Sequence, residues 1–114
     1  MKLGQRGEDL AASYLQKQGY KIIQRNYKTM IGEIDIIARD RDDLVFIEVK
    51  TRESLEYGHP FESVNKNKRR KIANVAMLYL KRLKDIPPCR FDVVSVYYEQ
   101  GRAEFNLIQD AFEM

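Results

Sequence analysis

Two stretches decide the fold of this chain: GEIDIIA at residues 32–38 and VFIEVKTR at residues 45–52. Both are rich in β-branched and aromatic residues, so both predict β-strands. The polar segment 40–43 between them predicts that the two strands form a hairpin. Both runs are too continuously apolar for a sheet with one face in water, so we expect helices on both faces of a mixed sheet.

Ionisable residues interrupt these core strands at Asp35, Glu48 and Lys50. An ionised group in a buried strand must be paired, hydrogen-bonded or bound to a metal, because its desolvation otherwise costs several kcal/mol. Strand side chains alternate, so Glu48 and Lys50 share one face. If Arg39 lies opposite Leu44, the same register sets Asp35 directly opposite Glu48.

That register also sets Glu33 opposite Lys50. Two facing carboxylates with Cβ atoms about 5 Å apart repel one another unless a cation lies between them. A site made only of oxygen ligands suits Mg²⁺ or Mn²⁺ rather than zinc. A lysine beside such a pair can orient an attacking water and stabilise charge on a phosphate, which is the chemistry of phosphodiester cleavage. A glycosidase would also use two carboxylates, but it gives Lys50 no role.

The remaining helices and strands are predicted from the periodicity of apolar residues and from the residues that end helices and strands. We predict helices at 7–18 and 66–84 and strands at 20–26, 33–39, 44–52, 90–98 and 102–109, in the order αβββαββ. Residues 53–65 contain Gly58 and Pro60 without periodicity and predict a loop, a length that is more often functional than idle. The whole chain, 1–114, is predicted to form a single domain.

Charge is distributed unevenly along the chain. Residues 66–84 carry eight bases and no acid, whereas the other ninety-five residues have a net charge of −5. A basic helix set against a mildly acidic body indicates a polyanionic partner or a solvated helix face. The longest apolar run, 76–80, is too short to cross a bilayer, and the first residues do not resemble a signal peptide. A single cysteine, Cys89, fits a reducing compartment, so we expect a cytoplasmic protein without a membrane partner.

A third carboxylate is predicted on the first helix. Around the helix axis, Glu8 lies about 20° from Leu15, inside the apolar arc rather than on the wet face. Glu8 is therefore expected to point toward the sheet. The alternative is a carboxylate near the helix N-terminus, where the macrodipole favours negative charge.

The pattern of Asp35 followed by Glu48-Val49-Lys50, after a helix that carries Glu8, resembles the PD-(D/E)-x-K nuclease superfamily. Over nearly its whole length the chain further resembles the YraN-like (UPF0102) family of small bacterial proteins, relatives of archaeal Holliday-junction resolvases. The matching segments are Gly7-Glu8 with Ala11 and Tyr14-Leu15, Gly19-Tyr20, Arg25-Asn26, Gly32-Glu33-Ile34-Asp35, Phe46-Ile47-Glu48-Val49-Lys50-Thr51-Arg52 and Lys68.

The resemblance implies a restriction-endonuclease-like fold with a metal site at the hairpin. In that site Asp35 and Glu48 would bind Mg²⁺ or Mn²⁺, Lys50 would position the water, and Glu8 would complete the acidic set. Glu33 is a further candidate. Ile34 stands where the superfamily name has proline, a position at which many members vary.

Structural explanations compete with these roles. A buried salt-bridge network could account for Asp35, Glu48 and Lys50, and Glu33 could simply pair with Lys50. Asp92, which interrupts the strand at 90–98, is predicted to pair with Arg90 or with a base of the second helix rather than to join the site.

The basic residues predict contacts with backbone phosphates, which bind without sequence preference and weaken with salt. The candidates are Arg52, Lys66, Lys68, Arg69, Arg70 and Lys71. In the loop, His59 is predicted to be a surface residue, and Tyr57 and Phe61 are predicted to pin the loop to the core rather than to stack on bases. Cys89 is predicted to be structural.

The sequence thus predicts a Mg²⁺- or Mn²⁺-dependent endonuclease that acts on DNA, either duplex or branched in the manner of a Holliday junction. The alternative is a non-catalytic nucleic-acid-binding module that keeps the fold and acts through a protein partner. An RNA substrate is a weaker third possibility. Cleavage of a two-fold symmetric junction would call for a homodimer.

Overall fold

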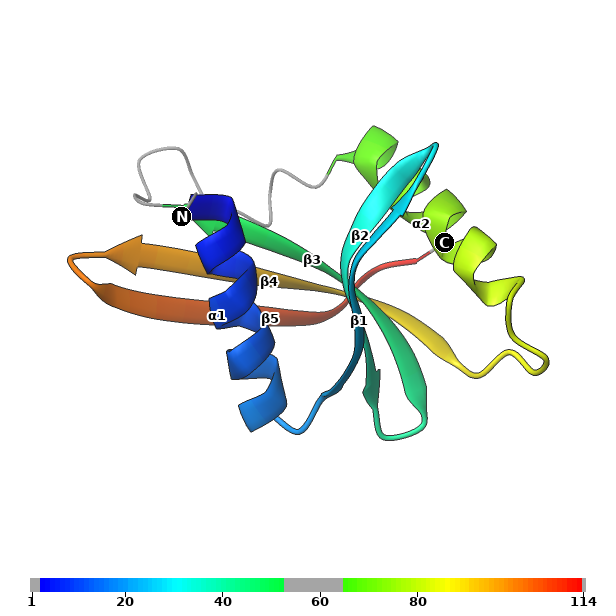
Figure 1. Ribbon diagram of the computed structural model, residues 1–114, viewed down its shortest axis with the longest axis horizontal. Coiled ribbons are helices and arrows are strands. Elements are labelled where there is room, and N and C mark those ends of the chain that lie inside the picture. The colour runs from blue at the N-terminus through cyan, green and yellow to red at the C-terminus, as the bar shows by residue number, and fades with distance from the viewer. Residues whose placement is uncertain (1–2, 53–64, 114) are drawn as a thin grey trace.

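The computed structural model describes residues 3–52 and 65–113 and has the predicted order αβββαββ. The elements are α1 (Leu3–Lys17), β1 (Lys21–Thr29), β2 (Gly32–Asp40), β3 (Asp43–Arg52), α2 (Lys66–Leu80), β4 (Cys89–Glu99) and β5 (Arg102–Phe112). One sheet holds the strands in the order β1-β2-β3-β4-β5, with β3 and β4 parallel and the other neighbours antiparallel (Figure 1). The predicted mixed α/β fold is confirmed.

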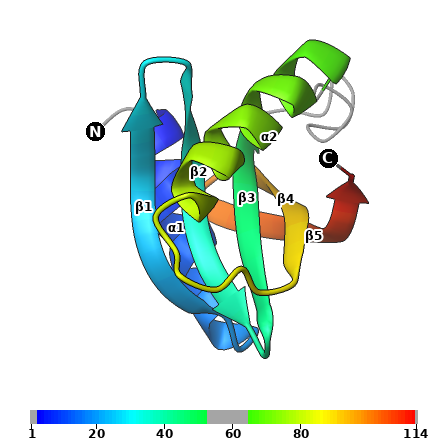
Figure 2. The ribbon, with the colours of Figure 1, turned by 90° about the vertical axis from the view of Figure 1, so that its right-hand side faces the viewer.

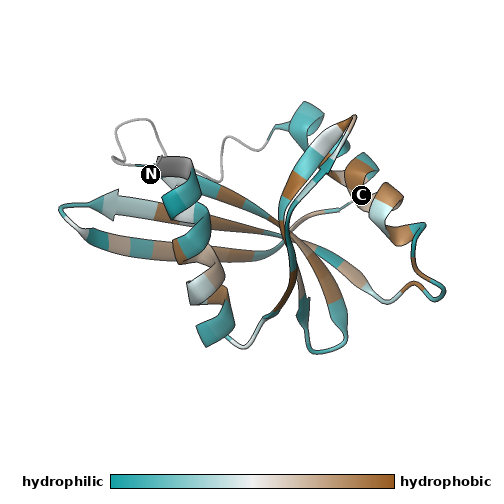
Figure 3. Ribbon diagram, viewed as in Figure 1, coloured by the Kyte–Doolittle hydropathy of each residue, from teal (hydrophilic) through white to brown (hydrophobic). Residues whose placement is uncertain are grey.

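The two helices cover opposite faces of the sheet, as predicted. Figure 2 shows α2 in front of the strands and α1 behind them. Alternate residues of β3 divide between the two cores: Val45 and Ile47 pack with α1, whereas Leu44 and Phe46 pack with α2. In Figure 3 the strands show hydrophobic colour near the centre of the molecule. The helices exclude water from both faces of the central strands, which is why these strands are continuously apolar.

Pairing between β2 and β3 stops partway along the hairpin. The predicted register holds from Asp40↔Asp43 to Ile36↔Ile47, which is the last pair. Beyond it β2 continues to pair with β1, and β3 continues to pair with β4 as far as Arg52↔Tyr97. The two strands therefore diverge, and Figure 1 shows β2 and β3 leading apart in the upper part of the view.

The N-terminal half of α1 lies against β3 because Gly7 permits a close approach. A methyl group on Gly7 would collide with the side chain of Thr51. Gly7 is the residue directly before Glu8, so this contact sets where Glu8 meets the sheet.

Four predicted boundaries were wrong by three or four residues. α1 begins at Leu3 rather than residue 7, and β1 ends at Thr29 rather than residue 26. α2 ends at Leu80 rather than residue 84, since Arg82 and Leu83 donate backbone hydrogen bonds to carbonyls three residues earlier, in tight turns. Leu83 still packs on the core, so the apolar stripe extends past the helix. β5 continues beyond residue 109 to Phe112 because Asp110 adopts a left-handed φ of 53° at an irregularity in the β4/β5 pairing.

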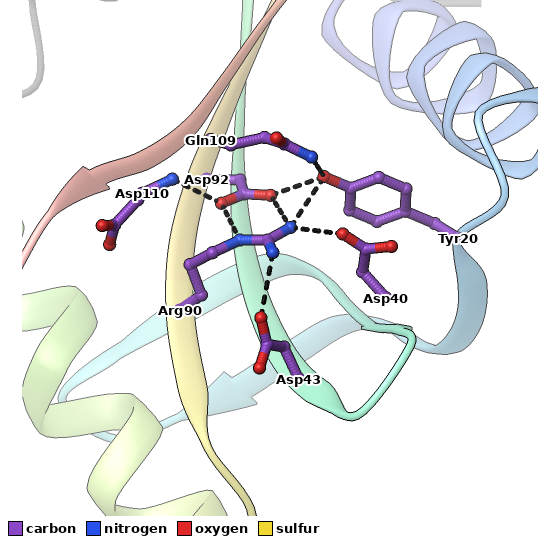
Figure 4. Close-up of polar contacts among 7 residues, drawn as sticks. All are labelled: Tyr20, Asp40, Asp43, Arg90, Asp92, Gln109 and Asp110. Atoms are coloured by element: carbon purple, nitrogen blue, oxygen red, sulfur yellow. Dashed lines mark hydrogen bonds and ion pairs between the residues drawn. The ribbon is translucent and has the colours of Figure 1, made fainter.

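Asp92 lies in a polar network at the end of the sheet near the β2–β3 turn (Figure 4). Its carboxylate is fully buried and accepts hydrogen bonds from the Tyr20 hydroxyl at 2.7 Å, the Arg90 guanidinium at 2.9 Å and the Asp110 backbone N–H at 2.9 Å. Arg90 also pairs with Asp40 and Asp43. The predicted pairing of Asp92 with Arg90 is confirmed.

The side-chain hydrogen bond and charge of Asp92 raise the pKa of Arg90, which stays a cation. Burial raises the pKa of Tyr20 to about 12, so its hydroxyl remains a donor. Cys89 Sγ lies 3.2 Å from the Pro87 carbonyl oxygen, and burial raises the pKa of its thiol, which favours the thiol over the reactive thiolate. The predictions for Tyr57, His59 and Phe61 lie outside the described residues.

Candidate functional site

β2 and β3 separate beyond the pair Ile36↔Ile47, and we call this point the fork. Asp35 lies at the fork. Its Oδ2 accepts a hydrogen bond from the Val49 backbone N–H at 2.8 Å, directly beyond the last paired residues of the two strands. Ile34 and Ile36 pack into opposite cores although they are two residues apart, so the alternation of β2 is interrupted at this aspartate. The carboxylate thus takes the place of a missing strand partner and faces β3.

Glu48 lies on β3 and is only 7% exposed. Its Oε1 is 2.7 Å from Lys68 Nζ and 3.5 Å from Lys50 Nζ. Lys50 comes from the same face of β3, two residues along, and Lys68 reaches in from the first turn of α2. Two ammonium groups from different elements therefore meet on one buried carboxylate oxygen.

The titration of these groups follows from burial and mutual charge. Burial raises the pKa of Asp35 to about 7, with a further rise from the Glu48 carboxylate, and the Val49 N–H opposes the shift. Burial also lowers the pKa of Lys50, and the neighbouring Lys68 lowers it further. Burial disfavours the charged form of Lys68 as well, but the Glu48 carboxylate, the Lys50 side chain and the Asp35 charge together raise the pKa of Lys68. Such opposed shifts in one cluster are typical of functional sites.

Glu8 approaches the same cluster from α1. Its side chain is half-buried, and its Oε1 is buried without a hydrogen-bond partner. Burial raises the pKa of Glu8, and the carboxylates of Glu33 and Glu48 raise it further, whereas Arg25 opposes the shift. Arg25 is itself held by Asp9 on α1 at 2.6 Å. The predicted inward orientation of Glu8 agrees with this burial.

The position predicted for Glu33 was wrong. Glu33 lies opposite Lys28 of β1 and is exposed. It does not face Lys50, because the β2/β3 ladder ends before reaching it, and the register partner of Lys50 is Ser95 on β4. Glu33 still adds negative charge near Glu8 and Asp35.

The basic residues of α2 divide into two groups. Lys66, Arg69, Arg70 and Lys71 are exposed in its first turns, although Arg69 also lies over the Phe112 ring at 5.8 Å. Lys68 points inward to Glu48 and so belongs to the acidic site. Arg52, at the end of β3, is half-buried, and its Nε is buried without a hydrogen-bond partner.

The inward orientation of Lys68 was missed, although helix periodicity carried the signal. Lys68 precedes Ile72 by four residues and Val75 by seven, and both are buried on the sheet side of α2. Positions at this spacing share one helix face. Lys68 therefore lies on the sheet-facing side of α2, and its ammonium group meets the Glu48 carboxylate beyond the apolar core.

The donor set suits a hard divalent cation. Asp35, Glu48 and Glu8 offer oxygen atoms, and the unpartnered Glu8 Oε1 is a buried acceptor that a cation would satisfy. Among the described residues no three His, Cys, Asp or Glu side chains are placed to hold one metal ion together. The Lys68 ammonium occupies one Glu48 oxygen, so a metal ion would share or replace that contact.

Comparison with known sequences identifies the family to which this chain is related. The model of the uncharacterised protein family UPF0102 matches residues 7–96. The chain belongs to the UPF0102 family. A UPF0102 protein of Symbiobacterium thermophilum is 50% identical over 113 residues, covering 97% of this chain and 96% of that protein. UPF0102 proteins of Syntrophomonas wolfei and Clostridioides difficile are each 46% identical and cover at least 95% of both chains.

The family resemblance predicted from the sequence is thus confirmed for UPF0102. The matched range begins within α1, ends within β4 and includes Glu8, Asp35, Glu48, Lys50 and Lys68. Within the part of this UPF0102 chain that the structure describes, no helix is long and apolar enough to cross a membrane.

Ionisation of Asp35 is expected to destabilise the metal-free protein. Its pKa rises from 3.8 to about 7 on folding. Between these pH values the folded state binds more protons than the unfolded state, so stability falls as pH rises through this window. Asp35→Asn keeps an oxygen for the Val49 N–H without the charge. We expect the variant to be about 2 kcal/mol more stable than wild type at pH 8, with the difference vanishing near pH 4.

Urea denaturation in the presence of EDTA measures this difference. Glu33→Gln is the matched control, since Glu33 is an exposed carboxylate of the same strand, and its stability should stay within about 0.5 kcal/mol of wild type. Equal stability of Asp35→Asn and wild type at pH 8 would show that the Asp35 carboxylate is well paired in the folded protein, as a structural salt-bridge network requires.

Proposed function

We propose that this UPF0102 protein is a divalent-metal-dependent endonuclease that cleaves phosphodiester bonds in DNA, with branched DNA as the preferred substrate. The convergence of Asp35, Glu48 and Lys50 at the fork between β2 and β3 carries the proposal. A half-buried acid with a raised pKa beside a second acid and a lysine is difficult to explain as a stabilising feature alone.

Each side chain has a role in this chemistry. Asp35 and Glu48 would hold Mg²⁺ or Mn²⁺, with Glu8 as a further ligand from α1. The bound cation would polarise the phosphate and lower the pKa of an attacking water. Lys50 would donate hydrogen bonds to that water and to a phosphate oxygen as negative charge develops there.

The first turns of α2 would bind the DNA backbone. The side chains of Lys66, Arg70 and Lys71 are exposed, and α2 begins beside the fork, since Lys68 in its first turn contacts Glu48. Positive charge near a helix N-terminus opposes the macrodipole, so it is a mildly unfavourable feature for folding that a phosphate partner would offset. Binding through these residues should weaken strongly with added salt.

Cleavage of defined DNA substrates tests the proposal. Linear duplex, single-stranded, flap and four-way-junction DNA would be incubated with the purified protein and Mg²⁺, Mn²⁺ or EDTA, beside Asp35→Ala prepared in parallel to exclude contamination. We expect metal-dependent cleavage, fastest on a branched substrate, that is lost in the variant. The same cleavage by wild type and Asp35→Ala would assign the activity to a contaminant and refute the proposal.

A non-catalytic nucleic-acid-binding module is the second candidate, favoured by one observation. Lys68 Nζ lies 2.7 Å from Glu48 Oε1, so a protein cation already neutralises the central carboxylate. A lysine that neutralises the carboxylate in this way is the arrangement expected of a site that binds no metal. DNA binding without cleavage under every metal, together with a melting temperature that Mg²⁺ and Mn²⁺ do not raise, would favour the module over the enzyme.

A further inference from the structure

The β1–β2 hairpin has an apolar tip. Its turn consists of Met30, which is fully exposed, and Ile31, which is 48% exposed. The turns of the β2–β3 and β4–β5 hairpins are the polar pairs Arg41-Asp42 and Gln100-Gly101. Figure 3 shows the contrast, with hydrophobic colour at the β1–β2 tip and hydrophilic colour at the other two. Hairpin turns ordinarily favour Gly, Asn and Asp, so turn chemistry does not explain these two residues.

The tip is held in a defined conformation. Thr29 Oγ1 accepts a hydrogen bond from the Ile31 backbone N–H at 3.2 Å, and its hydroxyl donates to the Gly32 carbonyl at 2.8 Å. Below the turn, the Tyr27 ring packs edge-on against Tyr79 of α2, with ring centroids 5.3 Å apart. The apolar pair is therefore presented on a braced hairpin, and little ordering entropy is lost when it meets a partner.

The tip lies at the same end of the molecule as the candidate site. Figures 1 and 2 both show the β1–β2 tip, the start of α1 and the start of α2 at one end of the sheet. A hollow between α1 and the hairpin is lined by Glu8 of the acidic site and by Asn26, Lys28 and Glu33 of the hairpin. Lys28 and Glu33, which line this hollow, are each two residues from the turn formed by Met30 and Ile31.

We propose that Met30 and Ile31 form an apolar wedge that packs against unstacked bases at the branch point of a DNA substrate. The inference rests on the proposed function and specifies how that site would select its substrate. Exposed Met and Ile side chains are suited to insertion between base steps. Unstacking is easiest where pairing is already interrupted, so the wedge favours branched over linear DNA. Lys28, exposed beside the turn, supplies positive charge for the adjoining phosphates.

The test compares a four-way junction with a linear duplex of the same length, in EDTA to prevent cleavage, for wild type and Met30→Ser/Ile31→Ser. The junction carries 2-aminopurine at the branch point, whose fluorescence rises when the base unstacks. We expect the double variant to bind the junction about 10-fold more weakly and the duplex within about 2-fold of wild type. The fluorescence rise seen with wild type should be lost.

Ile86→Ser is the matched control, because Ile86 is 66% exposed and lies between α2 and β4, away from the tip. It should bind both substrates as wild type does. Equal affinities of the double variant and wild type for the junction would refute the wedge while leaving the nuclease proposal intact. Wild type that neither binds nor cleaves any DNA would refute the proposed function and the wedge together.

Self-association through the tip is a further outcome. If sedimentation shows a wild-type dimer that the double variant converts to a monomer, and the junction preference of the monomer is unchanged, the apolar pair is a contact between copies and the wedge is refuted.

Discussion

Lys50→Met is expected to slow metal-dependent DNA cleavage about 100- to 1,000-fold, the range observed when one donor to a developing charge is removed. Methionine fills a similar volume on the half-buried face of β3, so the protein should remain folded. Lys50 Nζ lies 3.5 Å from Glu48 Oε1, and its removal takes positive charge away from the carboxylates. Metal affinity, measured by calorimetric titration with Mn²⁺, should therefore be retained or increased.

Slower cleavage together with retained metal affinity distinguishes a role of Lys50 in the chemistry from a structural role. Lys84→Met serves as the control, since Lys84 is an exposed lysine beyond the end of α2, and its cleavage rate should match that of wild type. A Lys50→Met protein that cleaves at the wild-type rate would remove Lys50 from the mechanism. Parallel loss of metal binding and cleavage would instead make Lys50 a structural support for the carboxylates.

Asp92→Ala is expected to lower the free energy of unfolding by about 3 to 5 kcal/mol, the range for removing one partner of a buried ion pair. The fully buried carboxylate joins Arg90, Tyr20 and the backbone N–H of Asp110. Alanine leaves each of these groups without one acceptor. Since small domains are stable by about 5 to 15 kcal/mol, the variant should be marginal or unfolded at 37 °C.

Urea denaturation at pH 7 measures the change. Asp92→Asn keeps an acceptor oxygen and should be less destabilising than the alanine variant, which keeps the prediction testable if Asp92→Ala does not fold. Asp42→Ala is the control, because Asp42 is exposed in the β2–β3 turn near the network. The network lies at the other end of the hairpin from the fork, so cleavage per folded molecule should not change. Destabilisation by less than about 1 kcal/mol would show that Arg90 is adequately paired by Asp40 and Asp43 alone.

The local sequence pattern was sufficient to predict much of the fold. The alternation and continuous apolarity of β2 and β3 predicted the hairpin, its register from Asp40 to Ile36 and the helices on both faces. The interrupted strand at 90–98 predicted that Asp92 pairs with Arg90 or with a base of the second helix, and Arg90 is the partner. These features depend on side-chain periodicity and on the cost of burying an unpaired charge, and both can be evaluated from neighbouring residues.

The sequence by itself therefore determined the α/β order, the register of the central hairpin, the UPF0102 relationship and the choice of Asp35, Glu48 and Lys50 as candidates. Only the tertiary structure decided that β2 and β3 part after Ile36, which removed Glu33 from Lys50 and turned Asp35 toward the Val49 N–H. It also decided that Lys68 reaches Glu48 across the space between α2 and the sheet. Strand divergence and helix docking depend on how whole elements pack together, and no short-range periodicity specifies them.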